Sequence, residues 1–429
     1  MTDRMYEFLV EEDEVRVCKG IPDEACQYVP RNFFLLGATK VLTRLADELA
    51  NAKTVLPWLL SILGASGIWV GMLVPVRESM SMLPQLAIAS FVQRTRRRKF
   101  AWICGAAIQA FALAAMAASA FLFVGPVAGE AVVGLLLLFS LARGICSVAS
   151  KDILGKTIPK TRRGRLNGFT VAIAGILTLA VGTLLATLVQ EESSIHMFVV
   201  LLAAAATLWV LSSLLVSRIQ ETVSDTGGTE GALRETLQRL AILRNDPKFC
   251  LFVVVRALFV STALAAPYYV VIARESGAAR SLGVFVIASG LASALSSVFW
   301  GRFADKSSRQ VLIMSGAFAS ILGVAFFLIV SSGRFSSQLG FLAPGAFFLL
   351  AIAHSGVRIG RKTYVVDLAT EDNRLDYVSV SNTIIGVIVL ASGLFGLLEP
   401  MVGAAGMLLI FSLLGGVGVL LGAWLPELE

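Results

Sequence analysis

Two arginines, Arg44 and Arg256, each interrupt a long apolar stretch, and they stand 212 positions apart in a chain of 429 residues. A charge near the centre of a bilayer is costly, so such a residue faces the protein interior and marks a functional site. The planar guanidinium fork suits carboxylate or phosphate groups. The pair therefore predicts an anion-binding site to which each half of the chain contributes one arginine.

Arg44 belongs to a polar stripe with Lys40, Asp47, Glu48 and Asn51. At 100° per residue these five side chains fall within a sector of about 100° on one helix. Lipid does not tolerate such a stripe, so we expect it to line a cavity or to pack against partner helices. Neutralisation of Arg44 by Glu48, four residues on, is the competing interpretation, and it leaves Lys40 and Asp47 unexplained.

Other apolar segments also carry ionisable residues. His354 stands 211 positions after Arg143, at the matching place in the second half, and either a packing role or a titrating role is open to it. The candidate substrate-binding residues are Lys40, Arg44, Arg77, Arg143, Arg256 and His354. A second group near the cytoplasmic end of its segment is expected to serve a gate, namely Arg358, Arg361, Lys362 and Asp367.

Three acids, Asp47, Glu48 and Glu78, are candidates for coupling transport to protons. Desolvation in a cavity favours the protonated carboxyl, whereas a neighbouring arginine favours the carboxylate. A substrate that pairs with the arginine would therefore free the acid to bind a proton. Local charge neutralisation is the alternative role.

The composition places these residues in a membrane. Hydrophobic residues make up 56% of the chain and charged residues 15%, with a mean hydropathy of +0.80, which is too apolar for an ordinary soluble protein. Because a transmembrane helix needs about 20 apolar residues, the sequence predicts an all-α polytopic protein with twelve spans. They lie near 33–62, 66–92, 100–124, 131–155, 167–190, 195–217, 249–272, 282–303, 310–332, 338–360, 378–398 and 401–425. Pro57 is expected to bend the long first span.

The positive charge indicates how the chain is oriented. It is concentrated in alternate loops, at 94–99, 156–165 and 302–309, which the positive-inside rule assigns to the cytoplasm together with both termini. We therefore expect a multi-pass protein of the cytoplasmic (inner) membrane. The net charge of +7 gives no reason to expect nucleic-acid binding.

The N-terminal arm lacks the features of a signal peptide, because its charged run is acidic. Cys18 and Cys26 have a spacing unlike common zinc patterns, and Cys104, Cys146 and Cys250 fall in or beside membrane segments. We therefore expect reduced thiols, no disulfide framework, no metal site and no cofactor.

The two halves of the chain repeat one design. Asp305 follows Gln93 by 212 positions, and Arg374 follows Arg163 by 211, close to the spacing of the arginine pair. Such duplication is typical of secondary transporters whose binding site lies where the repeats meet. The expected domains are a cytoplasmic arm (1–31), a six-helix bundle (32–217), a cytoplasmic linker with an amphipathic helix (218–248) and a second six-helix bundle (249–429).

One loop resembles a family signature. The string GRFADKSSRQ, from Gly301 to Gln310, is similar to the G-x-x-x-D-[RK]-x-G-[RK]-[RK] loop of the major facilitator superfamily, and Arg143-Gly144 resembles the arginine motif of its fourth helix. The first-half copy of the loop is degraded, with Gln93 in place of the acid. The resemblance implies two six-helix bundles around a central cavity, alternating access by rocking, and no covalent chemistry.

The resemblance also implies roles for individual residues. Asp305, Lys306 and Arg309 would form a gate latch, although a solvated turn is the competing interpretation. In the organophosphate/phosphate antiporter branch, one arginine from helix one and one from helix seven hold the substrate phosphate. Arg44 and Arg256 match those positions by helix and by half.

The sequence therefore predicts a secondary active transporter for a small organic or phosphorylated anion, coupled to protons or to a counter-ion, and monomeric in the lipid bilayer. One alternative is proton-driven export of drugs, metabolites or siderophores. Ala46-Asp47 resembles the Gly-Asp pair of exporters, but residues 172–182 lack their glycine-proline motif. A transporter-like sensor or scaffold is a further alternative. No nucleophile, metal cluster or phosphate loop indicates an enzyme.

Overall fold

The computed structural model describes residues 23–83, 88, 91–92, 94–188, 195–223, 242–276, 282–304, 306–369 and 374–427, and all regular secondary structure within them is helical. The helices of the first half are α2 (Asp23–Cys26), α3 (Val29–Leu49), α4 (Val55–Ile62), α5 (Gly67–Met82), α7 (Arg98–Leu122), α8 (Gly125–Thr157), α9 (Lys160–Leu188) and α10 (Ile195–Ser217). Those of the second half are α12 (Ile242–Asn245), α13 (Pro247–Leu258), α14 (Ser261–Leu264), α15 (Ala266–Glu275), α16 (Leu282–Ala304), α17 (Ser308–Ser331), η2 (Ser336–Gln338), α18 (Leu339–Leu368), α19 (Arg374–Ala391), η3 (Ser392–Leu398) and α20 (Glu399–Gly422).

The all-helical polytopic class predicted from the sequence is confirmed. Within the described residues, eight helices are long and apolar enough to cross a membrane. The first predicted span contributes none of them, because it is divided into α3 and α4 and carries the charged stripe. The count of twelve spans stays a prediction.

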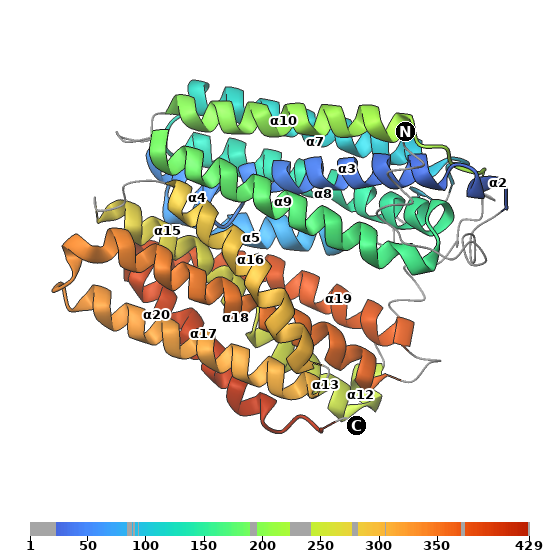
Figure 1. Ribbon diagram of the computed structural model, residues 1–429. Coiled ribbons are helices and arrows are strands. Elements are labelled where there is room, and N and C mark those ends of the chain that lie inside the picture. Colours follow the sequence, from blue (N-terminus) through green and yellow to red (C-terminus); the bar gives the residue numbers. More distant parts are fainter. Residues whose placement is uncertain are drawn as a thin grey trace.

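The helices form two bundles (Figure 1). Helices α3, α5, α7, α8, α9 and α10 pack together as the N-terminal bundle, and α13 with α15 to α20 pack as the C-terminal bundle. Contacts between the bundles come from α9 with α16, from α5 with α19 and η3, and from α4 with α15. The bundles lie close together near α4 and α15 and diverge toward the end that holds α2 and α12 (Figure 1).

Small residues bring the two bundles into contact at the end opposite α2 and α12. A Cβ atom added at Gly71 of α5 would lie 2.7 Å from the Cα atom of Gly396 in η3, so the two backbones touch. Such close approach is the usual way in which helices associate in a membrane, where apolar burial gives little drive. Trp58 of α4 and Phe285 of α16 add an edge-on ring contact with centroids 6.2 Å apart.

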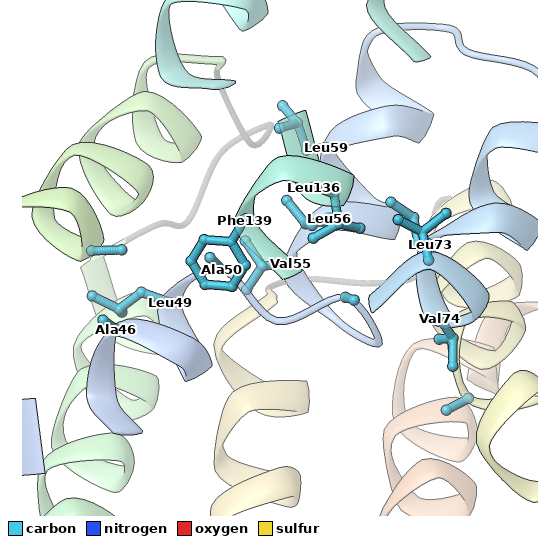
Figure 2. Close-up of a cluster of buried hydrophobic side chains, with 14 of the residues drawn as sticks. Ala46, Leu49, Ala50, Val55, Leu56, Leu59, Leu73, Val74, Leu136 and Phe139 are labelled. Atoms are coloured by element: carbon cyan, nitrogen blue, oxygen red, sulfur yellow. The ribbon is translucent and has the colours of Figure 1, made fainter. Parts of the chain in front are cut away.

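The first span is interrupted at 50–54, just before Pro57, which lies in the first turn of α4. The break includes Lys53, whose carbonyl would accept from residue 57 in a continuous helix, and a proline has no amide hydrogen to donate. The Asn51 side chain also favours the break, because its Oδ1 accepts from the Lys53 amide at 2.8 Å and competes with helical pairing. Apolar residues on both sides of the break pack against α8, as Figure 2 shows for Leu49, Leu56 and Phe139.

Several predicted features lie outside the described residues, namely Cys18, Gln93, Asp305 and the amphipathic part of the linker. The exact domain boundaries therefore stay predictions. Cys26 is disulfide-bonded, whereas Cys104, Cys146 and Cys250 are free. The expectation of a reduced thiol is wrong at Cys26, because spacing along the sequence does not encode which cysteines meet in three dimensions.

Candidate functional site

A polar cavity of about 170 Å³ lies between the two bundles. Its walls come from the end of α3, the break after it, α14, α15, α16 and α18. The side chains that can bind a polar ligand there are Glu48, Asn51, Lys53, Thr262, Ser289, Ser293, His354, Ser355 and Arg358. The position agrees with the expected site between the repeats.

Lys53 reaches across this cavity. Its Nζ atom lies 3.4 Å from Nε2 of His354 on α18, and Nδ1 of His354 lies 2.9 Å from Oγ1 of Thr262. Sequence periodicity missed Lys53, because on a continuous helix it would point roughly 180° away from the charged stripe. The break at 50–54 turns it into the cavity.

Glu48 lies on another part of the cavity wall. It accepts a hydrogen bond from Asn51 Nδ2 at 3.0 Å and one from Ser289 Oγ of α16 at 3.5 Å. Among the described residues no cation lies within 4 Å of its carboxylate. The local pairing of Arg44 with Glu48 that the sequence allowed is therefore not formed in this part of the chain.

Asp47 is the acid that the arginines neutralise. It forms ion pairs with Arg77 of α5, at 3.4 Å, and with Arg143 of α8. The Arg77 guanidinium also lies over the Phe139 ring, 5.2 Å from its centroid, where cation–π attraction adds to the ion pair. Three of the predicted site residues thus form one cluster inside the N-terminal bundle, held by α3, α5 and α8.

Arg256 of α13 is buried, with 6% of its surface exposed. It donates to Ser381 Oγ at 2.8 Å and to Asn382 Oδ1 at 2.7 Å, both on α19, while its buried Nε has no hydrogen-bond partner among the described residues. Among the described residues, the charged side chain that acts electrostatically on the Arg256 guanidinium is Arg361, which is also a cation. The positive charge of Arg256 is therefore solvated by neutral groups and is not cancelled.

Three cationic or basic residues share one face of α18. His354, Arg358 and Arg361 follow one another at helical spacings of four and three, and Arg358 lines the cavity. The sequence assigned Arg358 to the gate, but its place on this face brings it to the central site instead. Glu78 of α5 is acted on by Lys53 and Arg77 from its own half of the chain and by Arg361 and Arg358 from across the bundle interface.

The remaining predicted residues lie around this centre. Lys40 donates to Asn167 Oδ1 of α9 at 2.8 Å, within the N-terminal bundle. Arg44 is exposed, and neither it nor Arg256 lines the described cavity. The arginine pair thus flanks the cavity and does not form its wall.

Around the loop between α16 and α17, for which the sequence predicts the gate latch, the contacts of Arg309 stay within the C-terminal bundle. Arg309 donates to the Ala423 carbonyl at 2.6 Å and pairs with Glu427 at 3.3 Å, and Lys306 is exposed. Within the described residues no group of three or more His, Cys, Asp or Glu side chains is placed to hold a metal ion.

Comparison with known proteins decides the family. The sequence profile of the Major Facilitator Superfamily matches residues 45–394. The chain belongs to the major facilitator superfamily. The fold agrees with it: a mutant of the nucleoside transporter NupG superposes with a TM-score of 0.72 at 12% identity, covering 92% of this chain and 99% of that one. A D-xylose-proton symporter superposes with a TM-score of 0.68 at 14% identity, covering 92% and 98%.

Two relatives identified by sequence similarity are both uncharacterised proteins. An uncharacterised transporter of the major facilitator superfamily type from Methanocaldococcus jannaschii is 24% identical over 379 residues, covering 85% of this chain and 87% of the relative. An uncharacterised protein of Mycobacterium tuberculosis is 25% identical over 249 residues, which cover 57% of this chain and 48% of the relative. The chain thus spans about half the length of the mycobacterial relative. The solved structures are only 12% and 14% identical to this chain, so they establish its fold and nothing more.

Proposed function

We propose that this protein is a secondary active transporter that moves a small organic or phosphorylated anion through the central cavity by alternating access. The observation that carries the proposal is the uncancelled positive charge of the C-terminal bundle. Arg256, Arg358 and Arg361 have no carboxylate within 4 Å among the described residues. Charges held this way are costly unless a ligand pairs with them, and the guanidinium groups favour carboxylate or phosphate.

The acids supply a mechanism for coupling. Glu78 is the carboxylate on which Lys53 acts from the same half of the chain and Arg358 and Arg361 act from across the interface. A substrate anion that pairs with these cations competes with Glu78 for them. The freed carboxylate can then take up a proton, which gives symport, or the cations can exchange one anion for another. Asp47, already paired with two arginines, holds the N-terminal bundle together in this scheme.

The packing indicates which side the cavity faces. The bundles touch at the end away from α2 and α12, through Gly71 with Gly396 and through Trp58 with Phe285. In the predicted orientation, with both termini in the cytoplasm, this closed end faces outward and substrate reaches the cavity from the cytoplasm. Opening the closed end would require α5 to separate from η3.

Thermal unfolding of the purified protein tests the anion specificity. A ligand at a hundred times its Kd adds about 2.7 kcal/mol to the stability of the folded state. We expect inorganic phosphate, phosphate esters or small carboxylates to raise the Tm. Arg358→Ala, at the cavity wall, should remove the shift, and Arg256→Ala, outside that wall, should only weaken it. Arg334→Ala, at an exposed arginine outside the cavity, should keep it. Stabilisation by cationic drugs alone would contradict the anion proposal and favour the exporter.

A further inference from the structure

The central cavity holds charges of both signs, and they contact different helices. At one part of the wall Glu48 is held by Asn51 and by Ser289 of α16. At another part, Lys53 and His354 meet, and Arg358 lies one turn beyond His354 on α18. A carboxylate is therefore set against one wall and two cations against another.

Glu48 and Lys53 act on each other electrostatically, but they form no ion pair. Among the described residues Glu48 has no cation within 4 Å, and Lys53 and Arg358 have no carboxylate within that distance. Asp47 shows that this chain can pair such charges closely, since two arginines hold it. Glu78 acts on Lys53 without forming an ion pair, so a ligand can still pair directly with Glu48 and with the facing cations.

The rest of the cavity wall is made of apolar side chains and hydroxyls. Phe347, Leu350 and Ala266 supply the apolar surface, and Ser293 and Ser355 supply hydroxyl groups. A pocket of this kind accepts a short carbon skeleton with polar groups at its ends. The cavity volume of about 170 Å³ limits it to a small molecule.

We propose that the transported molecule is amphoteric, with an ammonium group that binds Glu48 and a carboxylate or phosphate group that binds Lys53 and Arg358. The inference rests on the proposed function, because it keeps the anionic group and adds a positive one. In this scheme Glu48 distinguishes aminated anions from plain ones, whereas the cations bind any small anion.

A second role for Glu48 makes a different prediction. If Glu48 only carried a coupling proton, replacing it would change the pH dependence of binding equally for plain and for aminated anions. If it binds an ammonium group, replacing it removes the advantage of the aminated anion alone. Matched ligands therefore separate the two roles.

The test uses the full chain in detergent and three matched ligand sets. They are 4-aminobutyrate with butyrate and butylamine, alanine with lactate and ethylamine, and 2-aminoethylphosphonate with ethylphosphonate and ethylamine. Binding is measured by thermal shift and by calorimetry. We expect the aminated anion of at least one set to bind about tenfold more tightly than its plain counterpart, the effect of one charge-assisted hydrogen bond.

The variants assign that preference to one residue. Glu48→Gln should remove the tenfold advantage and keep the binding of the plain anion, and Glu48→Asp should retain part of the advantage. Glu130→Gln, at an exposed carboxylate of α8, should change neither. Equal binding of aminated and plain anions by the unaltered protein, or a preference that survives Glu48→Gln, overturns the inference and leaves the anion transporter standing. If no anion binds, both proposals fail.

Discussion

Lys53 of the N-terminal bundle points its ammonium group at His354 of the C-terminal bundle, with 3.4 Å between Nζ and Nε2. A lysine ammonium group only donates, so Nε2 accepts and Nδ1 carries the hydrogen that Thr262 Oγ1 receives at 2.9 Å. The Thr262 hydroxyl in turn donates to the Phe259 carbonyl at 2.8 Å. One polar chain thus joins the break in the first span to the interruption between α13 and α14.

We expect Lys53→Met to loosen the contact between the bundles. A hydrogen bond to a charged group contributes about 1.5–3 kcal/mol, so its loss should raise the population of the separated arrangement roughly tenfold. Hydrogen exchange of α4 and α15 in lipid nanodiscs measures this population. Lys151→Met, at an exposed lysine of α8, is the control, and equal exchange in both variants would contradict the role of Lys53.

Asp47→Asn should destabilise the N-terminal bundle. Arg77 and Arg143 would lose their shared carboxylate, and because these side chains are 17–32% exposed, we expect a loss of about 1–3 kcal/mol in the free energy of unfolding. Combining Asp47→Asn with Arg143→Gln should recover part of the loss, because one unpaired charge is removed. Additive losses in the double variant would show that the ion pair contributes little.

Gly71→Ala should disturb the closed end. The added methyl group would lie 2.7 Å from the Cα atom of Gly396, so α5 and η3 must move apart. In a Ser66→Cys background, at the residue before α5, we expect a water-soluble maleimide to label the new thiol faster when Gly71→Ala is added. Gly134→Ala in α8, where an added Cβ meets nothing within 4 Å, is the matched control and should leave the labelling rate unchanged. Equal labelling with Gly71→Ala would contradict the role of this contact in closing the end.

The start of α13 predicts a pH dependence of stability. Burial alone would raise the pKa of the Asp246 carboxyl, but hydrogen bonds from the Tyr377 hydroxyl and from the amides of Phe249 and Lys248 outweigh it and hold that pKa below its usual value. The stability gained is therefore fully present above the unfolded pKa of about 3.9 and is lost as the pH falls through the lower folded value.

Thermal unfolding of Asp246→Ala against pH checks this sign. The Tm difference from the unaltered protein should be constant between pH 8 and pH 5, and it should shrink as the pH falls below about 4. A difference that grows on acidification would contradict the role of the Asp246 carboxylate. Tyr377→Phe should reproduce part of the effect, because it removes the 2.6 Å bond to Asp246 Oδ2 and keeps the aromatic ring.

Of the residues predicted for the site, Glu48 and His354 line the cavity. The charged stripe placed Asp47 and Glu48 in the interior, and the half-chain offset paired Arg143 with His354. Both rules depend only on helix geometry and on the cost of charge in lipid. They could not say which charges would pair, because Asp47 meets Arg77 and Arg143 only when α3, α5 and α8 pack together.

Hydropathy and charge spacing alone establish a polytopic helical protein with a duplicated, cationic interior, since these properties are local along the chain. Only the tertiary structure decides that Lys53 and Arg358 reach the cavity while Arg44 and Arg256 flank it. The physical reason is the break at 50–54. It ends the helical periodicity on which the sequence inference depended, and it turns Lys53 from the far side of the helix toward His354.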